Sequence, residues 1–397
     1  MVVARMSRYL SVSVALAVAL LLLVGVAPLP VRAVSHAVAV TLNDTSPGLV
    51  GGNSDVIHNP GCATTGTGIC SLRDAVIFAN AQAVGDTTTI TLPAGTYTLT
   101  ITGAGEDRAM TGDLDLRRNV VIAGAGAGTT IVQASPTDSA SGIDRVFDVG
   151  AFGDATSATF SGVTIRHGNS VGGADGGSIL VETSGSSLTL NDCVVADNQT
   201  SRNGGGISVT GGATLVLNRT TVSGNITTST YIVNGGGIFN AGTVTVTNST
   251  FSGNHADSDG GGGIANSGGT LTVMNSTFAG NSGSPGGGIR NDGGTLTVTN
   301  STFSGNSASA GGGIWNYGGT PTVTSSTFAA NTATGGGGID DESGTLTATN
   351  TLIADNTATG GHGPDASADF AVNSKNNLLG IADNYTAGIS NGVNGNL

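Results

Sequence analysis

Two adjacent carboxylates, Asp340 and Asp341, precede a histidine, His362, that stands between two glycines. Hydrolysis of a glycosidic bond requires two carboxyl groups beside the bond, one that protonates the leaving oxygen and one that activates water or attacks. Asp341 and His362 are 21 residues apart, which is close to the length of one sequence repeat described below. Asp340, Asp341 and His362 are therefore the candidate catalytic residues for cleavage of a polysaccharide.

The register of the repeats argues against this catalytic pair. Asp341 occupies the repeat position that is asparagine in the preceding repeats. Successive side chains of a strand point to opposite faces, so Asp340 and Asp341 are expected to face opposite ways. We therefore assign no catalytic residue and keep the three as the alternative. The asparagine row that Asp341 continues is Asn240, Asn266, Asn291 and Asn316.

The positions beside this asparagine row predict a binding surface instead. They should point outward and stack from coil to coil, which brings the single tryptophan and a tyrosine together with charged residues. Exposed aromatic rings rimmed by charged groups suit stacking on a sugar ring or contact with a partner protein. The predicted surface comprises Arg290, Asp292, Trp315, Tyr317, Asp340 and Glu342.

A calcium site of the kind that assists lyase chemistry needs several carboxylates beside a basic residue. Asp113 and Asp115 lie near Arg117 and Arg118, but they alternate with leucines. This alternation predicts the solvated face of a strand, so we assign no metal or cofactor and keep calcium as an alternative that the sequence does not support. Three cysteines without a Cys-x-x-Cys pair do not predict a zinc site.

The elements that would position these residues come from an internal repeat. Gly-Gly-Gly-Ile recurs from residue 204 onward, after a variant Gly-Gly-Ser-Ile at 176–179, and its isoleucines are 28, 31, 26, 25, 25 and 25 residues apart. Each unit continues with an alternating apolar run, a phenylalanine and an asparagine. Short strands at this period predict a β-solenoid, in which identical side chains stack about 4.8 Å apart. The blades of a β-propeller, the rival architecture, are longer, at about 40–50 residues.

The beginning of the chain predicts export. Arg5 and Arg8 precede an apolar run and a Pro-rich segment that ends at Ala33, the arrangement of a secretory signal peptide at 1–33. An uncleaved membrane anchor is the alternative, and after cleavage no transmembrane segment remains. In an oxidising compartment Cys62 and Cys70 can close a disulfide, and Cys193 is expected to be a buried free thiol.

Two motifs resemble known families. Residues 70–75, Cys-Ser-Leu-Arg-Asp-Ala, resemble the CSLREA motif of secreted bacterial repeat proteins, and the Gly-Gly-Gly-Ile and Phe-x-x-Asn pair resembles the polymorphic outer-membrane protein repeat. Both resemblances imply an all-β, right-handed parallel β-helix of the pectate-lyase-like superfamily, whose first coil is capped by a helix, predicted here over 71–84. The Asp340-Asp341 and His362 motifs resemble polygalacturonase-like hydrolases, but the Asn-Thr-Asp and Arg-Ile-Lys of that family have no counterpart here.

The expected organisation is therefore a signal peptide at 1–33, an N-terminal cap with a disulfide loop and helix at 34–86, a β-helix at 87–380 and a tail at 381–397. Coils are irregular to about residue 160 and regular after it. The tail shows no evident cap, which predicts that the sequence is part of a longer protein. With 26 acidic against 13 basic residues, nucleic acid is not an expected partner. We expect a secreted or cell-surface structural and recognition module that binds a polysaccharide or cell-surface ligand. The alternative is a polysaccharide-degrading enzyme on the same fold.

Overall fold

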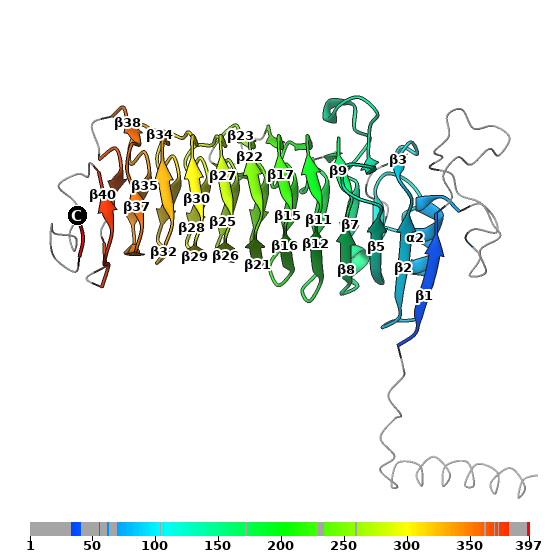
Figure 1. Ribbon diagram of the computed structural model, residues 1–397. Helices are drawn as coiled ribbons and strands as arrows, with labels where there is room; N and C mark the ends of the chain where they lie inside the picture. The colour runs from blue at the N-terminus through cyan, green and yellow to red at the C-terminus, as the bar shows by residue number, and fades with distance from the viewer. Residues whose placement is uncertain are drawn as a thin grey trace, which may run out of the picture. The chain divides into compact units, whose positions relative to one another are not determined.

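The computed structural model describes a parallel β-helix built from Ser35 onward (Figure 1). Each of the central coils contributes one strand to each of three long sheets, here called A, B and C, and every strand pair of these sheets is parallel. The sequence prediction of a parallel β-solenoid is confirmed. The residues that the structure describes are 33–40, 55, 62, 70–103, 105, 107–170, 173–228, 234–258, 260–360, 363–368, 370–371, 373–380 and 395–397. The predicted signal peptide and most of the tail lie outside them.

Sheet A has eleven strands in the order in which they occur along the chain. They are β1 (Ser35–Ala39), β2 (Thr87–Leu92), β5 (Asn119–Gly124), β8 (Ser157–Ser161), β12 (Ser187–Asn191), β16 (Thr214–Asn218), β21 (Thr243–Thr247), β26 (Thr270–Met274), β29 (Thr295–Thr299), β32 (Thr322–Thr324) and β36 (Thr347–Thr349). The strand β1, which the sequence analysis did not predict, adds a strand to sheet A beside β2.

Sheet B also has eleven strands and sheet C has ten. Sheet B comprises β3 (Gly95–Thr98), β6 (Thr130–Gln133), β9 (Thr164–Arg166), β13 (Val194–Ala196), β17 (Thr221–Ser223), β22 (Thr250–Ser252), β27 (Thr277–Ala279), β30 (Thr302–Ser304), β33 (Thr327–Ala329), β37 (Leu352–Ile353) and β40 (Leu378–Leu379). Sheet C comprises β4 (Leu114–Leu116), β7 (Phe147–Val149), β11 (Ile179–Val181), β15 (Ile207–Val209), β20 (Ile238–Asn240), β25 (Ile264–Ser267), β28 (Ile289–Asp292), β31 (Ile314–Tyr317), β35 (Ile339–Ser343) and β39 (Ala366–Ser367).

Short strands and turns complete the connections between sheets B and C. They are β10 (Asn169–Ser170), β14 (Gln199–Thr200), β18 (Ile226–Thr227), β23 (His255–Ala256), β19 (Asn234–Gly235), β24 (Gly260–Gly261), β34 (Thr332–Ala333), β38 (Thr357–Ala358) and the 3-10 turn Ser139–Ser141. A second 3-10 turn, Ala151–Gly153, lies between β7 of sheet C and β8 of sheet A.

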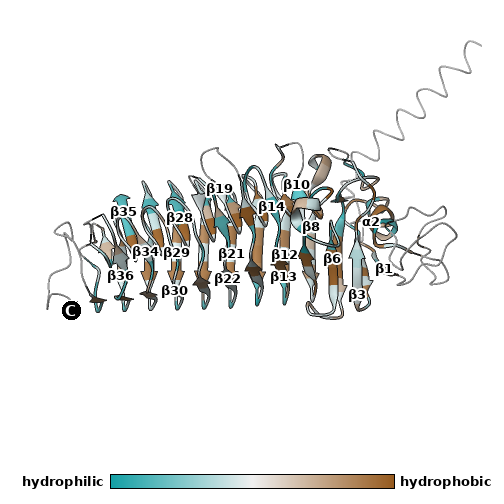
Figure 2. Ribbon diagram, turned by 90° about the horizontal axis from the view of Figure 1, so that it is seen from above, coloured by the Kyte–Doolittle hydropathy of each residue, from teal (hydrophilic) through white to brown (hydrophobic). Residues whose placement is uncertain are grey.

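The interior is apolar because alternate side chains of each strand face the axis. Figure 2 shows hydrophobic bands that recur from strand to strand along the helix. The phenylalanine rings of successive coils stack face to face, with centroids 4.6–4.7 Å apart for Phe251, Phe278, Phe303 and Phe328. The third glycine of each Gly-Gly-Gly-Ile lies against this ladder, since a Cβ on Gly288 would stand 2.9 Å from the Phe303 ring.

Each corner of the coil carries its own polar ladder. Buried asparagines such as Asn281 run along the corner between sheets B and C, and a second buried row that includes Asn291 runs between C and A. At the corner between A and B, buried serines such as Ser276 accept from the backbone of the preceding coil. The remaining asparagine row, which includes Asn300, adopts a positive φ at the same corner. These ladders supply partners for turn backbone that the sheets leave unpaired.

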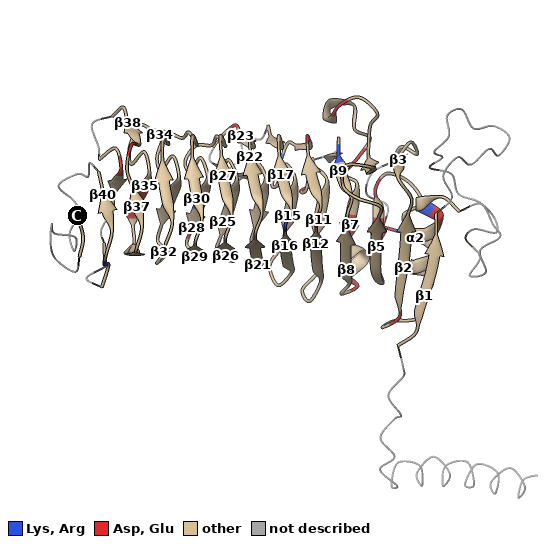
Figure 3. Ribbon diagram, viewed as in Figure 1, with Lys and Arg blue, Asp and Glu red and all other residues tan. Residues whose placement is uncertain are grey.

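The single helix of the described residues, α2 (Leu72–Asn80), begins at the capping box of Ser71 and Asp74. It is shorter than the predicted 71–84 but lies where the sequence placed it, and it contacts β2 and β4. Asn80 donates to Asp115 O at 2.7 Å and accepts from Arg117 N at 2.9 Å, so it pairs with the edge strand of sheet C. Figure 3 shows that charged residues accompany α2 and the first coils and are sparse on the middle coils.

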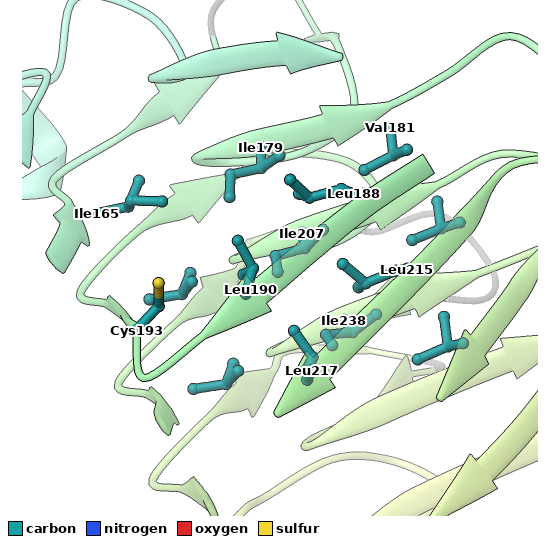
Figure 4. Packing of buried hydrophobic residues seen from close by; sticks show 14 of the residues in the cluster. Ile165, Ile179, Val181, Leu188, Leu190, Cys193, Ile207, Leu215, Leu217 and Ile238 are labelled. Atoms are coloured by element: carbon teal, nitrogen blue, oxygen red, sulfur yellow. The ribbon is translucent and has the colours of Figure 1, made fainter. Parts of the chain in front are cut away.

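The cysteines lie as predicted. Cys62 and Cys70 form a disulfide with their Cα atoms 4.8 Å apart. Cys193 is a buried free thiol among isoleucines and leucines of neighbouring coils (Figure 4). Burial raises its pKa to about 11, which keeps it protonated at neutral pH.

Candidate functional site

One column of side chains runs along the outer face of sheet C. The strand register pairs one residue of each coil with the next. In chain order the column reads Asp115, Asp148, Leu180, Ser208, Phe239, Ala265, Arg290, Trp315, Asp340 and Ser367. These residues differ in chemistry from coil to coil, whereas the neighbouring column is mostly isoleucine. Different coils of the outer column are therefore able to form different binding sites.

The C-terminal half of the column carries a cluster that we call the aromatic platform, formed by Arg290, Asp292, Trp315 and Tyr317. The Trp315 and Tyr317 rings are parallel within 4°, with centroids 5.8 Å apart. The Arg290 guanidinium lies over the Trp315 ring at 5.0 Å, and it donates to Asp292 at 3.1 Å. Strands β28 and β31 hold these side chains side by side, since Arg290 pairs with Trp315 and Asp292 with Tyr317.

The predicted exposure of this surface is wrong for two of its residues. Trp315 is only 7% exposed and Arg290 6%, whereas Tyr317 is 49% exposed. The reason is that the glycine-rich connection of each coil packs over the outer face of sheet C. A Cβ on Gly311 would stand 2.6 Å from the backbone nitrogen of Trp315. The exposed part of the platform is therefore Tyr317, with Trp315 as its buried support.

The strand register also moves Glu342 away from its predicted neighbour. A β-bulge between β31 and β35 places Tyr317 opposite Ser343, so Glu342 is not in the Tyr317 column. Such a bulge inserts an extra residue and redirects side chains. Glu342 is exposed beside the platform.

The alternative catalytic residues do not share a face among the described residues. Asp341 ends the buried asparagine ladder, where its Oδ1 accepts from Asn316 Nδ2 at 2.6 Å. Asp340 lies in the outer column beside Trp315 and is partly buried. His362 lies outside the described residues.

The N-terminal end of the column holds a second cluster that we call the acidic cluster, formed by Asp113, Asp115 and Asp148. The predicted solvated face at Asp113 and Asp115 is wrong, because both are at most 2% exposed. One oxygen of each of the three carboxylates lies within 4.8 Å of those of the other two. The Arg145 guanidinium contacts Asp113 at 2.5 Å and Asp148 at 3.6 Å.

Burial dominates the electrostatics of this cluster. It raises the pKa of Asp148 well above the usual value of an aspartate, although Arg145 opposes the shift. It also raises the pKa of Glu182, which lies near the same guanidinium. Carboxylates shifted in this way hold their protons more readily than exposed ones, and such shifts are common at functional sites.

The segment 107–112 lies beside the acidic cluster, and Arg73 of the motif at 70–75 holds it in place. Arg73 is fully buried, pairs with Asp55, and donates to the backbone oxygens of Ala109, Gly112 and Asp113 at 2.7–3.1 Å. The backbone of Ala109 in turn donates to Asp115 at 2.6 Å. The sequence analysis missed Asp148 and Arg145. The signal was present, because Leu114-Asp115-Leu116 and Phe147-Asp148-Val149 repeat the same apolar-Asp-apolar pattern in paired strands.

Comparison with known proteins matches one segment of the chain to a family. Residues 300–317 match the repeat of the Chlamydia polymorphic membrane protein family. The segment spans β30 and β31, including Trp315 and Tyr317, and it confirms the predicted resemblance to this repeat. The resemblance of residues 70–75 to CSLREA stays a prediction.

Two solved structures are similar to the chain. One is the A-module of the mannuronan C-5 epimerase AlgE6 of Azotobacter vinelandii, 18% identical over 78% of this chain and 80% of that one, with a TM-score of 0.43. The other is the PL6 family alginate lyase AlyGC, 12% identical over 76% of this chain and 49% of that one, with a TM-score of 0.27. No curated protein matches the sequence. Within the described residues, no helix has the length and apolar character needed to cross a membrane.

Proposed function

We propose that this chain is a secreted or surface-displayed recognition module whose aromatic platform binds a polysaccharide. The observation that carries the proposal is an exposed Tyr317 stacked in parallel on a buried Trp315. A ring held in this way offers a rigid apolar surface to the face of a sugar and loses little conformational entropy on binding.

Charged groups around the ring supply the polar contacts that sugar hydroxyls need. Arg290 holds Asp292 at the edge of the platform, and Glu342 is exposed on the next coil. A few placed polar groups around an apolar contact are typical of sites that bind small polar ligands. The secreted or surface location is supported by the leader sequence, the disulfide and the match to a membrane-protein repeat.

Intrinsic fluorescence tests the proposal, because Trp315 is the only tryptophan of the chain. Titration of the full chain with a panel of acidic and neutral polysaccharides is expected to change its emission for at least one of them. Tyr317→Ala should weaken that binding at least about tenfold, since it removes the exposed ring, and Tyr317→Phe should retain it. Phe152→Ala, at an exposed aromatic residue of another coil, is the matched control and should leave binding unchanged.

Two results would contradict the proposal. One is binding that Tyr317→Ala leaves unchanged, and the other is a panel in which no polysaccharide alters the emission. An assay of reducing-end release on the same panel tests the alternative of a polysaccharide-degrading enzyme. Cleavage that Asp341→Asn abolishes would replace the recognition module with the hydrolase.

A further inference from the structure

We propose that the acidic cluster of Asp113, Asp115 and Asp148 binds one calcium ion that ties the first two coils of sheet C together beneath the 107–112 segment. Sequence analysis assigned no metal here because the two aspartates before Arg117 were expected in solvent. Their burial changes that assignment.

The cluster gathers negative charge in a small buried volume. One oxygen of each of the three carboxylates lies within 4.8 Å of those of the other two, and the Arg145 guanidinium pairs with Asp113 and Asp148. Arg73 adds positive charge near Asp113, but its guanidinium is paired with Asp55 and with backbone oxygens. Asp107 and Glu182 add further negative charge nearby. Negative charge gathered in a buried site favours a cation beside it.

A second observation points to a ligand. The Oδ1 atom of Asp148 is buried and has no hydrogen-bond partner among the described residues, while the Oδ2 atom faces Arg145. The side chain of Asp148 is 6% exposed. Buried carboxylate oxygens normally have partners, which makes this oxygen a candidate ligand for a cation.

The donor set suits calcium. All three ligand groups are carboxylates, which hard cations prefer. Their closest oxygens lie within 4.8 Å of one another, which one ion at about 2.3–2.6 Å from each oxygen is able to span. Magnesium holds its ligands at about 2.0–2.1 Å in a strict octahedron and keeps several waters, for which a buried site of this kind is poorly adapted.

The position of the cluster gives the ion a structural role. Asp115 and Asp148 are direct register partners on β4 and β7, so the ion would join neighbouring coils. Burial of all three carboxylates argues against a role in bridging a polymeric substrate. The same segment carries Ala109, which Arg73 anchors to the helical cap.

Calorimetric titration of the chelator-treated full chain with CaCl₂ tests the site, with thermal unfolding as the second readout. We expect one ion per chain and a rise in Tm of at least about 3 °C at calcium concentrations far above Kd. Magnesium at the same concentration should give a much smaller rise.

Asp148→Asn keeps the shape of the side chain but removes its charge. This variant should fold, should be at least as stable as the parent chain in chelator, and should lose calcium binding and the rise in Tm. Asp192→Asn, at an exposed aspartate paired with Arg219 on another coil, is the control and should retain both. Absence of binding at millimolar calcium, binding that survives Asp148→Asn, or an equal response to magnesium would each overturn the proposal.

Discussion

The buried asparagine ladder between sheets B and C makes the sharpest prediction about stability. Asn281 has no exposed surface and its amide makes four hydrogen bonds to neighbouring coils. Its Oδ1 accepts from Asn254 N and Nδ2 at 3.1 and 2.9 Å, and its Nδ2 donates to Phe251 O and Asn306 Oδ1 at 3.0 and 2.9 Å. Substitution by alanine removes all four bonds at once.

The size of the effect follows from these contacts. Each lost bond is worth about 1 kcal/mol, and a buried group left without a partner adds about 1–3 kcal/mol. Asn254 N–H loses the acceptor that the structure shows for it, whereas Asn254 Nδ2 keeps Val222 O. We therefore expect Asn281→Ala to lower the free energy of unfolding by about 5–7 kcal/mol.

A matched control comes from the exposed asparagine row. Asn300 makes one amide contact of 3.3 Å to Asn275 and has a φ of 50°. Asn300→Ala should cost about 1 kcal/mol because alanine disfavours this conformation, and Asn300→Gly should be nearly neutral. Urea unfolding followed by circular dichroism measures all three. If Asn281→Ala falls within about 1 kcal/mol of Asn300→Ala, the energetic role given to the buried ladder is refuted.

Three further predictions concern single buried groups. Because burial raises the pKa of Cys193 to about 11, iodoacetamide should not label the folded chain at neutral pH, and labelling should appear only in denaturant. Burial also raises the pKa of Tyr97 from 10.0 to about 12. The protonated phenol therefore contributes its full stabilisation of the folded state below pH 10, and this contribution is lost as the pH rises from 10 to 12. In urea unfolding between pH 10 and 12, Tyr97→Phe should remove this part of the fall in the free energy of unfolding. The same pH dependence in the variant and the parent chain would contradict the role given to Tyr97. Phe303→Ala removes a ring stacked on both sides and should cost about 3–5 kcal/mol in thermal unfolding, whereas a cost below about 1 kcal/mol would argue against the ring ladder.

The ladders were predictable because their information is local and repeated. A constant step of 25 residues places Phe278 over Phe303 and Asn291 over Asn316, so the register follows from counting residues. The same counting placed Asp341 in the ladder beneath Asn316. It failed at Glu342, where a bulge shifts the strand register although the step between coils stays at 25 residues.

Burial of the candidate sites was not predictable in the same way. Leu114 and Leu116 alternate with Asp113 and Asp115 as they would on a surface strand, and the cover over them comes from a segment that Arg73 holds 36–40 residues away in sequence. The cover over Trp315 comes from the glycine-rich connections. Because glycine has no side chain, these connections pack close to the strand backbone, and the spacing of apolar residues in the sequence does not predict this contact.

The architecture itself limits where specific chemistry is able to arise. Inside the coil, stacking favours identical side chains, because isoleucine on isoleucine or asparagine on asparagine completes the packing and hydrogen bonds of its neighbours. A residue that differs from its neighbours there interrupts a ladder. The outer column of sheet C is free of this constraint, and it is where Asp148, Arg290 and Trp315 occur. Function in this chain is therefore expected where the repeat is broken on an outward face, and both the aromatic platform and the acidic cluster meet that condition.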